Sequence, residues 1–140
     1  MWRSDVVIGS RSSGASRLVN KRRDPALELN PTTDIPEIEA FTEWALCDEV
    51  QTAIAGMGIT KPTPIQCLTT GPVLARKDVI AKAETGTGKT LAFGAGMVSM
   101  IDPTRSTVLG LVLAPTRELA LQVHDVLCEL GNSRGIKTCL

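Results

Sequence analysis

Apolar residues recur at helical spacing in two stretches of the chain. Over 47–57 they stand at positions i, i+3, i+4 and i+7, and a similar spacing runs through 116–130. The first set is Val50, Ala53, Ile54 and Met57, and the second is Leu119, Ala120, Val123, Val126, Leu127 and Leu130. Each set falls on one face of a helix, so both stretches are predicted to pack one face on a core. Glycines indicate the ends, Gly56 and Gly58 for the first helix and Gly131 for the second.

A third helix is predicted from capping residues rather than from periodicity. Thr63-Pro64-Ile65-Gln66 combines a capping hydroxyl, a proline at the first helical position and a glutamine three residues after the cap. The short helix that begins there is predicted to end near Gly71-Pro72.

Two short apolar runs without helical spacing are predicted to be buried strands. Residues 79–81 precede a glycine-rich turn at 85–88 and a helix over about 89–100. Residues 107–114 are almost continuously apolar, as is typical of a strand covered on both faces. The order strand, turn, helix, strand, helix favours an α/β fold with a parallel sheet and right-handed crossovers.

The formal net charge of the chain is zero, but its first residues are basic and the rest is acidic. Residues 1–23 hold six bases and one acid, so the rest of the chain carries a charge of −5. Residues 24–40 are acidic and contain prolines, so 1–40 is predicted to be a disordered extension and 41–140 the folded part. The Arg- and Ser-rich start fits either a mitochondrial transit peptide or a basic arm that touches phosphate backbones.

Neither the cysteines nor the apolar runs suggest a secreted or membrane protein. Cys47, Cys67, Cys128 and Cys139 show no paired spacing, so they are predicted to be free thiols in a reducing compartment. No apolar run approaches the roughly 18 residues that span a bilayer. We therefore expect an intracellular protein of the cytoplasm, nucleus or mitochondrion. His124, the sole histidine, is predicted to face solvent.

The residues between the first predicted strand and its helix match a phosphate-binding P-loop. They are Ala83, Glu84, Thr85, Gly86, Thr87, Gly88, Lys89 and Thr90, with alanine in the first glycine position. Small residues let backbone N–H groups surround phosphate oxygens, and the helix start adds its positive dipole end. Lys89 would contact the β and γ phosphates, while the Thr90 hydroxyl would coordinate Mg²⁺ bound with the nucleotide.

Two further motifs surround this loop and narrow its meaning. Residues 58–66 (Gly-Ile-Thr-Lys-Pro-Thr-Pro-Ile-Gln) resemble the Q motif of DEAD-box RNA helicases, and Phe41 stands where that family has an upstream aromatic. Pro115-Thr116-Arg117-Glu118-Leu119-Ala120 resembles the family's motif Ia. The three motifs occur in the family's order and the resemblance covers about residues 41–140, so the chain resembles the first RecA-like domain of such a helicase.

The resemblance implies roles for individual residues. Gln66 would read the adenine edge with its amide and Phe41 would stack on the base, which implies ATP with Mg²⁺ as the cofactor. Lys89 and Thr90 would act in catalysis. Pro115, Thr116, Arg117 and Glu118 would contact the RNA backbone without reading its sequence.

Each assignment has a plainer alternative. Gln66 completes a capping box, Phe41 is an ordinary core aromatic, and 116–118 is an exposed helix start with an Arg117–Glu118 charge pair. At the level of the whole chain, the alternatives are another P-loop NTPase, such as a kinase or DNA helicase, and a non-catalytic nucleotide- or RNA-binding remnant.

The family's acidic tetrad, its Ser-Ala-Thr motif and its second RecA-like domain do not occur within these 140 residues. The resemblance therefore implies an incomplete first RecA-like domain. We expect this chain by itself to bind ATP but to hydrolyse it negligibly, because nothing in it holds the metal from its far side or positions the water.

Overall fold

The computed structural model describes residues 5–8 and 35–140. In chain order the elements are β1 (Asp5–Ile8), the 3-10 helix η1 (Phe41–Glu43), α1 (Asp48–Gly56), α2 (Pro64–Leu74), β2 (Val79–Lys82), α3 (Lys89–Met100) and α4 (Arg117–Asn132). The predicted helices over 47–57, 89–100 and 116–130 are therefore confirmed, the second of them at both ends. Most of the predicted N-terminal extension lies outside the described residues, as does most of its basic segment.

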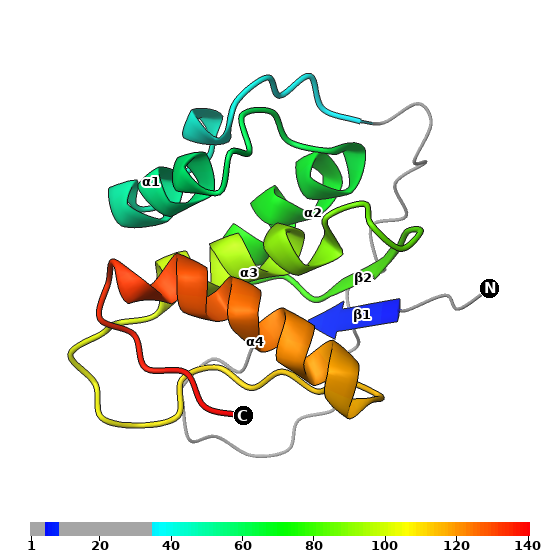
Figure 1. Ribbon diagram of the computed structural model, residues 1–140. Helices are drawn as coiled ribbons and strands as arrows, with labels where there is room; N and C mark the ends of the chain where they lie inside the picture. The colour runs from blue at the N-terminus through cyan, green and yellow to red at the C-terminus, as the bar shows by residue number, and fades with distance from the viewer. Residues whose placement is uncertain (1–4, 9–34) are drawn as a thin grey trace, which may run out of the picture.

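Helix α3 lies at the centre of the fold. It packs against α2 on one side and α4 on the other, and α1 contacts both α3 and α4 (Figure 1). The buried face of α4 consists of Val123, Leu127 and Leu130, and that of α1 of Val50 and Ile54, as their spacing predicted. These side chains join one core with Phe41 of η1, with Trp44 directly after η1, and with residues of α3, among them Leu91, Phe93 and Val98.

Two glycines let α3 approach its neighbours closely. A Cβ atom on Gly96 would lie 2.7 Å from Cγ1 of Val73 in α2, and one on Gly94 would lie 3.0 Å from Cδ2 of Leu127 in α4. In the middle of a helix each glycine costs roughly 1 kcal/mol relative to alanine. Close packing on both sides of α3 is the structural reason for these two glycines.

The sheet differs from the predicted parallel one. The described strands form a two-stranded antiparallel pair in which Asp5 lies opposite Lys82 and Ile8 opposite Val79. Asp5–Ile8 lies within the predicted N-terminal extension and forms a strand in this structure, while the division of the chain at residue 40 stays a prediction. Three consecutive β-branched residues in this segment favour extended backbone, and the edge of β2 supplies hydrogen-bonding partners.

Residues 107–114 do not form the predicted strand. The segment runs past α3, where a Cβ on Gly110 would lie 3.2 Å from Sδ of Met97, but it pairs with neither of the described strands. Val108 and Leu113 are each 86% exposed, and Ile80 in β2 is 75% exposed. An apolar run indicates that a segment tends to be buried. A strand also needs a neighbouring strand for its backbone hydrogen bonds, and the apolar run gives no information on that neighbour.

Two predicted helix ends are also wrong. Helix α2 continues through Pro72 to Leu74. The proline removes one helical hydrogen bond, but Val73 beyond it is buried against α3, and this burial outweighs the loss. Helix α4 continues through Gly131, which is buried and whose position would place a Cβ 3.3 Å from Ile136. The left-handed turn falls four residues later at Gly135, with φ of 65°.

The packing at Gly96 leads to a stability prediction. Gly96→Ala should lower the free energy of unfolding by about 1 kcal/mol, because overpacking of a buried site costs roughly 1–3 kcal/mol and outweighs the gain in helix propensity. Gly56→Ala is the matched control, since a Cβ there meets nothing within 4 Å. Urea unfolding measures both. Gly96→Ala should cost less in a Val73→Ala background than in the parent, because the contact that it overpacks is then absent, and a Gly96→Ala variant as stable as the parent would contradict the packing argument.

Candidate nucleotide-binding site

The P-loop connects the end of β2 to the start of α3. Its two glycines take backbone angles that suit glycine, with φ of 86° at Gly86 and 81° at Gly88, where α3 is capped. Glu84, Thr85 and Gly86 are exposed, so the loop presents its backbone to solvent at the positive end of α3. Gly88 is restricted a second time, because a Cβ there would lie 2.4 Å from Nε2 of Gln66.

The charged side chain of the loop lies across its own backbone. Nζ of Lys89 donates hydrogen bonds to the carbonyl oxygens of Ala83, at 2.7 Å, and Glu84, at 2.5 Å. The Thr87 hydroxyl donates to the same Glu84 carbonyl at 2.8 Å. The ammonium therefore lies within the loop, bonded to the carbonyls of the loop itself. Thr90, half-buried, follows in the first turn of α3.

The Q-motif segment is hydrogen-bonded to this loop. The Thr63 hydroxyl donates to the Thr87 carbonyl at 2.8 Å, and Nε2 of Gln66 donates to the Gly88 carbonyl at 3.2 Å. Oε1 of Gln66 accepts from the Thr63 N–H at 2.9 Å. The sequence did not reveal the Thr63 hydroxyl as a contact of the loop, because a threonine before a helix already has a sufficient role as its cap.

The capping alternative for Gln66 is thus confirmed, and the side chain is only 2% exposed. Its amide still has one N–H and one lone pair unused by these bonds. A contact to adenine stays a prediction. Phe41 is likewise 6% exposed and meets the Trp44 ring edge-on, with 5.5 Å between ring centroids. That burial is what the core alternative predicts, and stacking on a base stays a prediction.

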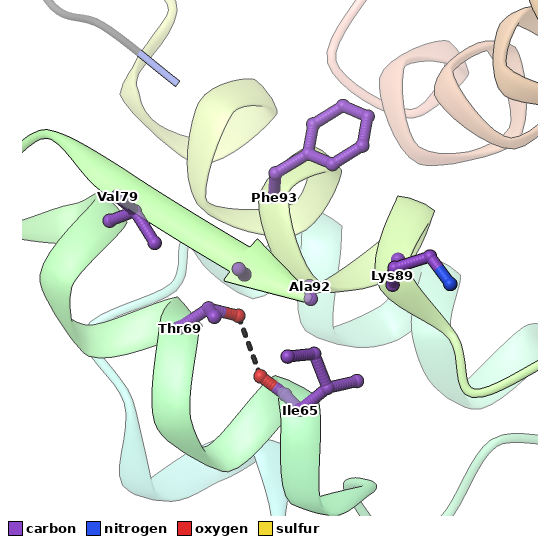
Figure 2. Close-up of a pocket in the computed structure, with 7 residues that line it drawn as sticks. Ile65, Thr69, Val79, Lys89, Ala92 and Phe93 are labelled. Carbon is purple, nitrogen blue, oxygen red and sulfur yellow. Dashed lines mark hydrogen bonds between the residues drawn. The ribbon is translucent and has the colours of Figure 1, made fainter. Parts of the chain in front are cut away.

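A small cavity lies behind the loop between α2, β2 and α3 (Figure 2). It has a volume of about 10 Å³ and is lined by Ile65, Thr69, Val79, Ala81, Lys89, Ala92 and Phe93. The Thr69 hydroxyl is bonded to the Ile65 carbonyl at 2.7 Å (Figure 2). A space of this size holds at most about one water molecule, so the cavity is too small for a nucleotide.

The motif Ia residues form an exposed helix start. Pro115, Thr116, Arg117 and Glu118 are all exposed, and the Thr116 hydroxyl caps α4 by accepting from the Leu119 N–H at 3.2 Å. Among the described residues there is no ion pair between Arg117 and Glu118. The guanidinium is therefore not held by the neighbouring carboxylate that the surface-pair alternative required.

Other predicted features are settled more simply. The four cysteines are free thiols, as predicted. Within residues 5–8 and 35–140 no cluster of ligating side chains suits a metal ion, and no helix there has the length and hydropathy to cross a membrane. The His124 side chain faces solvent only in part, since it is 26% exposed and its Nε2 lies 3.3 Å from Oγ1 of Thr138.

The hydrogen bonds of Gln66 lead to a second stability prediction. Gln66→Ala should cost about 1–3 kcal/mol in unfolding free energy, because it leaves the Thr63 N–H and the Gly88 carbonyl without this partner. Gln122→Ala, at an exposed position of α4, should stay within about 0.5 kcal/mol of the parent. Urea unfolding of both variants measures the difference, and equal effects would show that the link from α2 to the loop contributes no stability.

Comparison with known proteins agrees with this geometry. The family model for DEAD/DEAH box helicases matches residues 63–140. The DEAD-box ATP-dependent RNA helicase CshA of Geobacillus kaustophilus is 46% identical over 97 residues, which cover 69% of this chain and 21% of the relative. CshA of Bacillus cereus is 41% identical over 97 residues, covering 69% of this chain and 18% of the relative. The chain thus spans about a fifth of the length of these relatives.

Solved structures give the same result. Saccharomyces cerevisiae Dbp5 L327V, bound to Gle1 H337R and IP6, superposes with a TM-score of 0.68 at 34% identity, over 71% of this chain and 26% of Dbp5. A DEAD-box protein from Methanococcus jannaschii superposes with a TM-score of 0.57 at 31% identity, over 67% of this chain and 26% of that protein. Dbp5 has also been solved with RNA and ADP BeF3, and that structure superposes with a TM-score of 0.66 at 34% identity, over 71% of this chain and 26% of Dbp5. The chain belongs to the DEAD/DEAH box helicase family.

Proposed function

We propose that this chain is the ATP-binding part of a DEAD-box RNA helicase, which couples ATP hydrolysis to the unwinding of RNA duplexes or the remodelling of RNA–protein complexes. The observation that carries the proposal is the pair of hydrogen bonds from Thr63 and Gln66 to the P-loop carbonyls. A generic P-loop needs only its own glycines, lysine and hydroxyl. Here a second motif is tied to the loop, and its glutamine retains an unused donor and acceptor for a base.

The residues present suit a nucleotide and its metal. Backbone N–H groups of Ala83–Gly88 would bind phosphate oxygens, Lys89 would leave its carbonyl partners for the β and γ phosphates, and the Thr90 hydroxyl would ligate Mg²⁺. Gln66 would read the adenine edge, with Phe41 beside the base. Bound Mg²⁺ would supply charge neutralisation at the phosphates.

The RNA contact is proposed for Pro115, Thr116, Arg117 and Glu118. The first turn of α4 carries backbone N–H groups without helical partners, of which Leu119 is capped by Thr116. Arg117 adds a planar donor fork on the same exposed turn. These groups suit phosphate oxygens and carry no base-specific pattern, so binding is expected to be independent of sequence and weakened by salt.

Nucleotide selectivity tests the proposed base contact. The parent chain should bind ATP more tightly than GTP, and Gln66→Ala should remove most of that preference, because the amide is the group that distinguishes the two bases. Lys89→Ala should lower the affinities for ATP and GTP alike by about tenfold or more, since a charge-assisted contact contributes roughly 1.5–3 kcal/mol. Isothermal titration with both nucleotides measures this, with Gln122→Ala as the control. A Gln66→Ala chain that keeps its ATP preference would favour another class of P-loop NTPase.

Turnover is predicted to be negligible in this chain by itself. Its 140 residues hold no acidic tetrad to bind the metal from its far side or to position the attacking water. In a phosphate-release assay with saturating RNA, the rate should stay far below about 1 s⁻¹, the low end of the usual enzyme range. A rate near that value would refute the assignment of hydrolysis to residues that this chain does not contain.

A further inference from the structure

An ion pair that the proposed function does not use joins two segments of the chain beside the Q motif. Nζ of Lys61 lies 2.5 Å from Oε2 of Glu39, which is 22 positions earlier in the sequence. Lys61 lies in the loop between α1 and α2, and residues 35–40 run alongside this loop (Figure 1). The side chains of Lys61 and Glu39 are 64% and 75% exposed, so their contact is not a by-product of core packing.

The Glu39 side of the pair is anchored to the core. Phe41, two residues later, is 6% exposed, and Ile38, one residue earlier, packs against the same core. Oε1 of Glu43 accepts a hydrogen bond from the Glu39 N–H at 2.7 Å, which holds the backbone before η1. The Ile38 carbonyl accepts from Sγ of Cys67 at 3.9 Å, so this segment also contacts the first turn of α2. Glu39 therefore presents its carboxylate from a fixed stretch of backbone.

The Lys61 side of the pair leads to the side chain of Gln66. Lys61 stands two residues before Thr63, and Pro62 between them is buried and has a restricted φ angle. The Thr63 N–H donates to Oε1 of Gln66 at 2.9 Å, and the Thr63 hydroxyl donates to the Thr87 carbonyl at 2.8 Å. The position of the chain at Thr63 therefore affects where the Gln66 amide lies relative to the P-loop.

We propose that Lys61 and Glu39 are positioning residues for adenine recognition, an inference that rests on the proposed function. Their ion pair holds the chain before Thr63 against the anchored backbone before η1, and thereby fixes the orientation of the Gln66 amide. Hydrogen bonds weaken steeply as their angle departs from linear, so a small rotation of this amide changes the selectivity between adenine and guanine. Neither Lys61 nor Glu39 contacts the nucleotide in this role.

Two plainer roles for the pair predict different results. If Lys61 acted only as a positive charge near the phosphates, removal of the Glu39 carboxylate would strengthen the binding of ATP and GTP alike. If the pair were a surface contact without influence on the site, both affinities would stay unchanged. The positioning role predicts instead that loss of the Glu39 carboxylate lowers the preference for ATP over GTP.

The experiment is isothermal titration of the full chain with ATP and with GTP, and the readout is the ratio of the two affinities. Glu39→Gln and Lys61→Gln should each lower this ratio by about two- to fivefold, a factor within the range that exposed ion pairs contribute. The reversed pair, Glu39→Lys with Lys61→Glu, should restore most of the ratio, and Lys61→Arg should keep it. The controls Glu129→Gln and Lys77→Gln make the same charge changes at exposed positions of α4 and of the turn after α2, and should leave the ratio unchanged.

The outcomes separate this inference from the proposed function. A parent preference for ATP that Gln66→Ala removes but Glu39→Gln and Lys61→Gln retain would overturn the positioning role alone. A reversed pair whose ratio stays as low as in the single variants would also overturn it. A parent chain without any preference for ATP would contradict the proposed base contact, and this inference with it. Loss of the ratio in both single variants, with recovery in the reversed pair, supports the positioning role.

Discussion

The close approach of α3 to α2 and α4 is the constraint on which the other features depend. The first residues of α3 are the last residues of the P-loop, so whatever holds this helix also holds Lys89 and Thr90. Glycine at 94 and 96 removes the side chains that would keep α2 and α4 away. Because α2 is drawn in, its first turn comes within hydrogen-bonding distance of the loop, where Thr63 and Gln66 meet the carbonyls of Thr87 and Gly88.

Local signals predicted the helices well, because their information lies within a few residues. The apolar face of α4, the proline and glutamine at the start of α2, and the extent of α3 all follow from spacing and capping. The P-loop could be predicted equally well, since phosphate binding restricts the residue types at eight consecutive positions. The ends at Pro72 and Gly131 were misjudged because buried contacts of Val73 and Ile136 outweighed the local preference of these residues.

The sheet and the finer geometry of the site were beyond the sequence for a different reason. A strand forms only beside a hydrogen-bonding neighbour. The residues of β2 do not reveal that its partner is antiparallel, and the residues of 107–114 do not reveal that this segment lacks a partner among the described strands. The double use of Gln66 as cap and loop contact likewise depends on a distance between segments 22 residues apart. The motif identifies the residue, while the packing decides which of its atoms are already occupied.

The bond between Gln66 and the Gly88 carbonyl has a consequence for energetics. The Gln66 amide contacts the loop that would bind phosphate and, by the proposed function, also contacts the base. The binding free energies of the base and of the phosphates therefore depend on each other. Any shift of the amide that improves one contact changes the other, which makes the two a coupled pair with a shared interaction free energy. By thermodynamic reciprocity, adenosine would alter the affinity for pyrophosphate by the same factor by which pyrophosphate alters the affinity for adenosine.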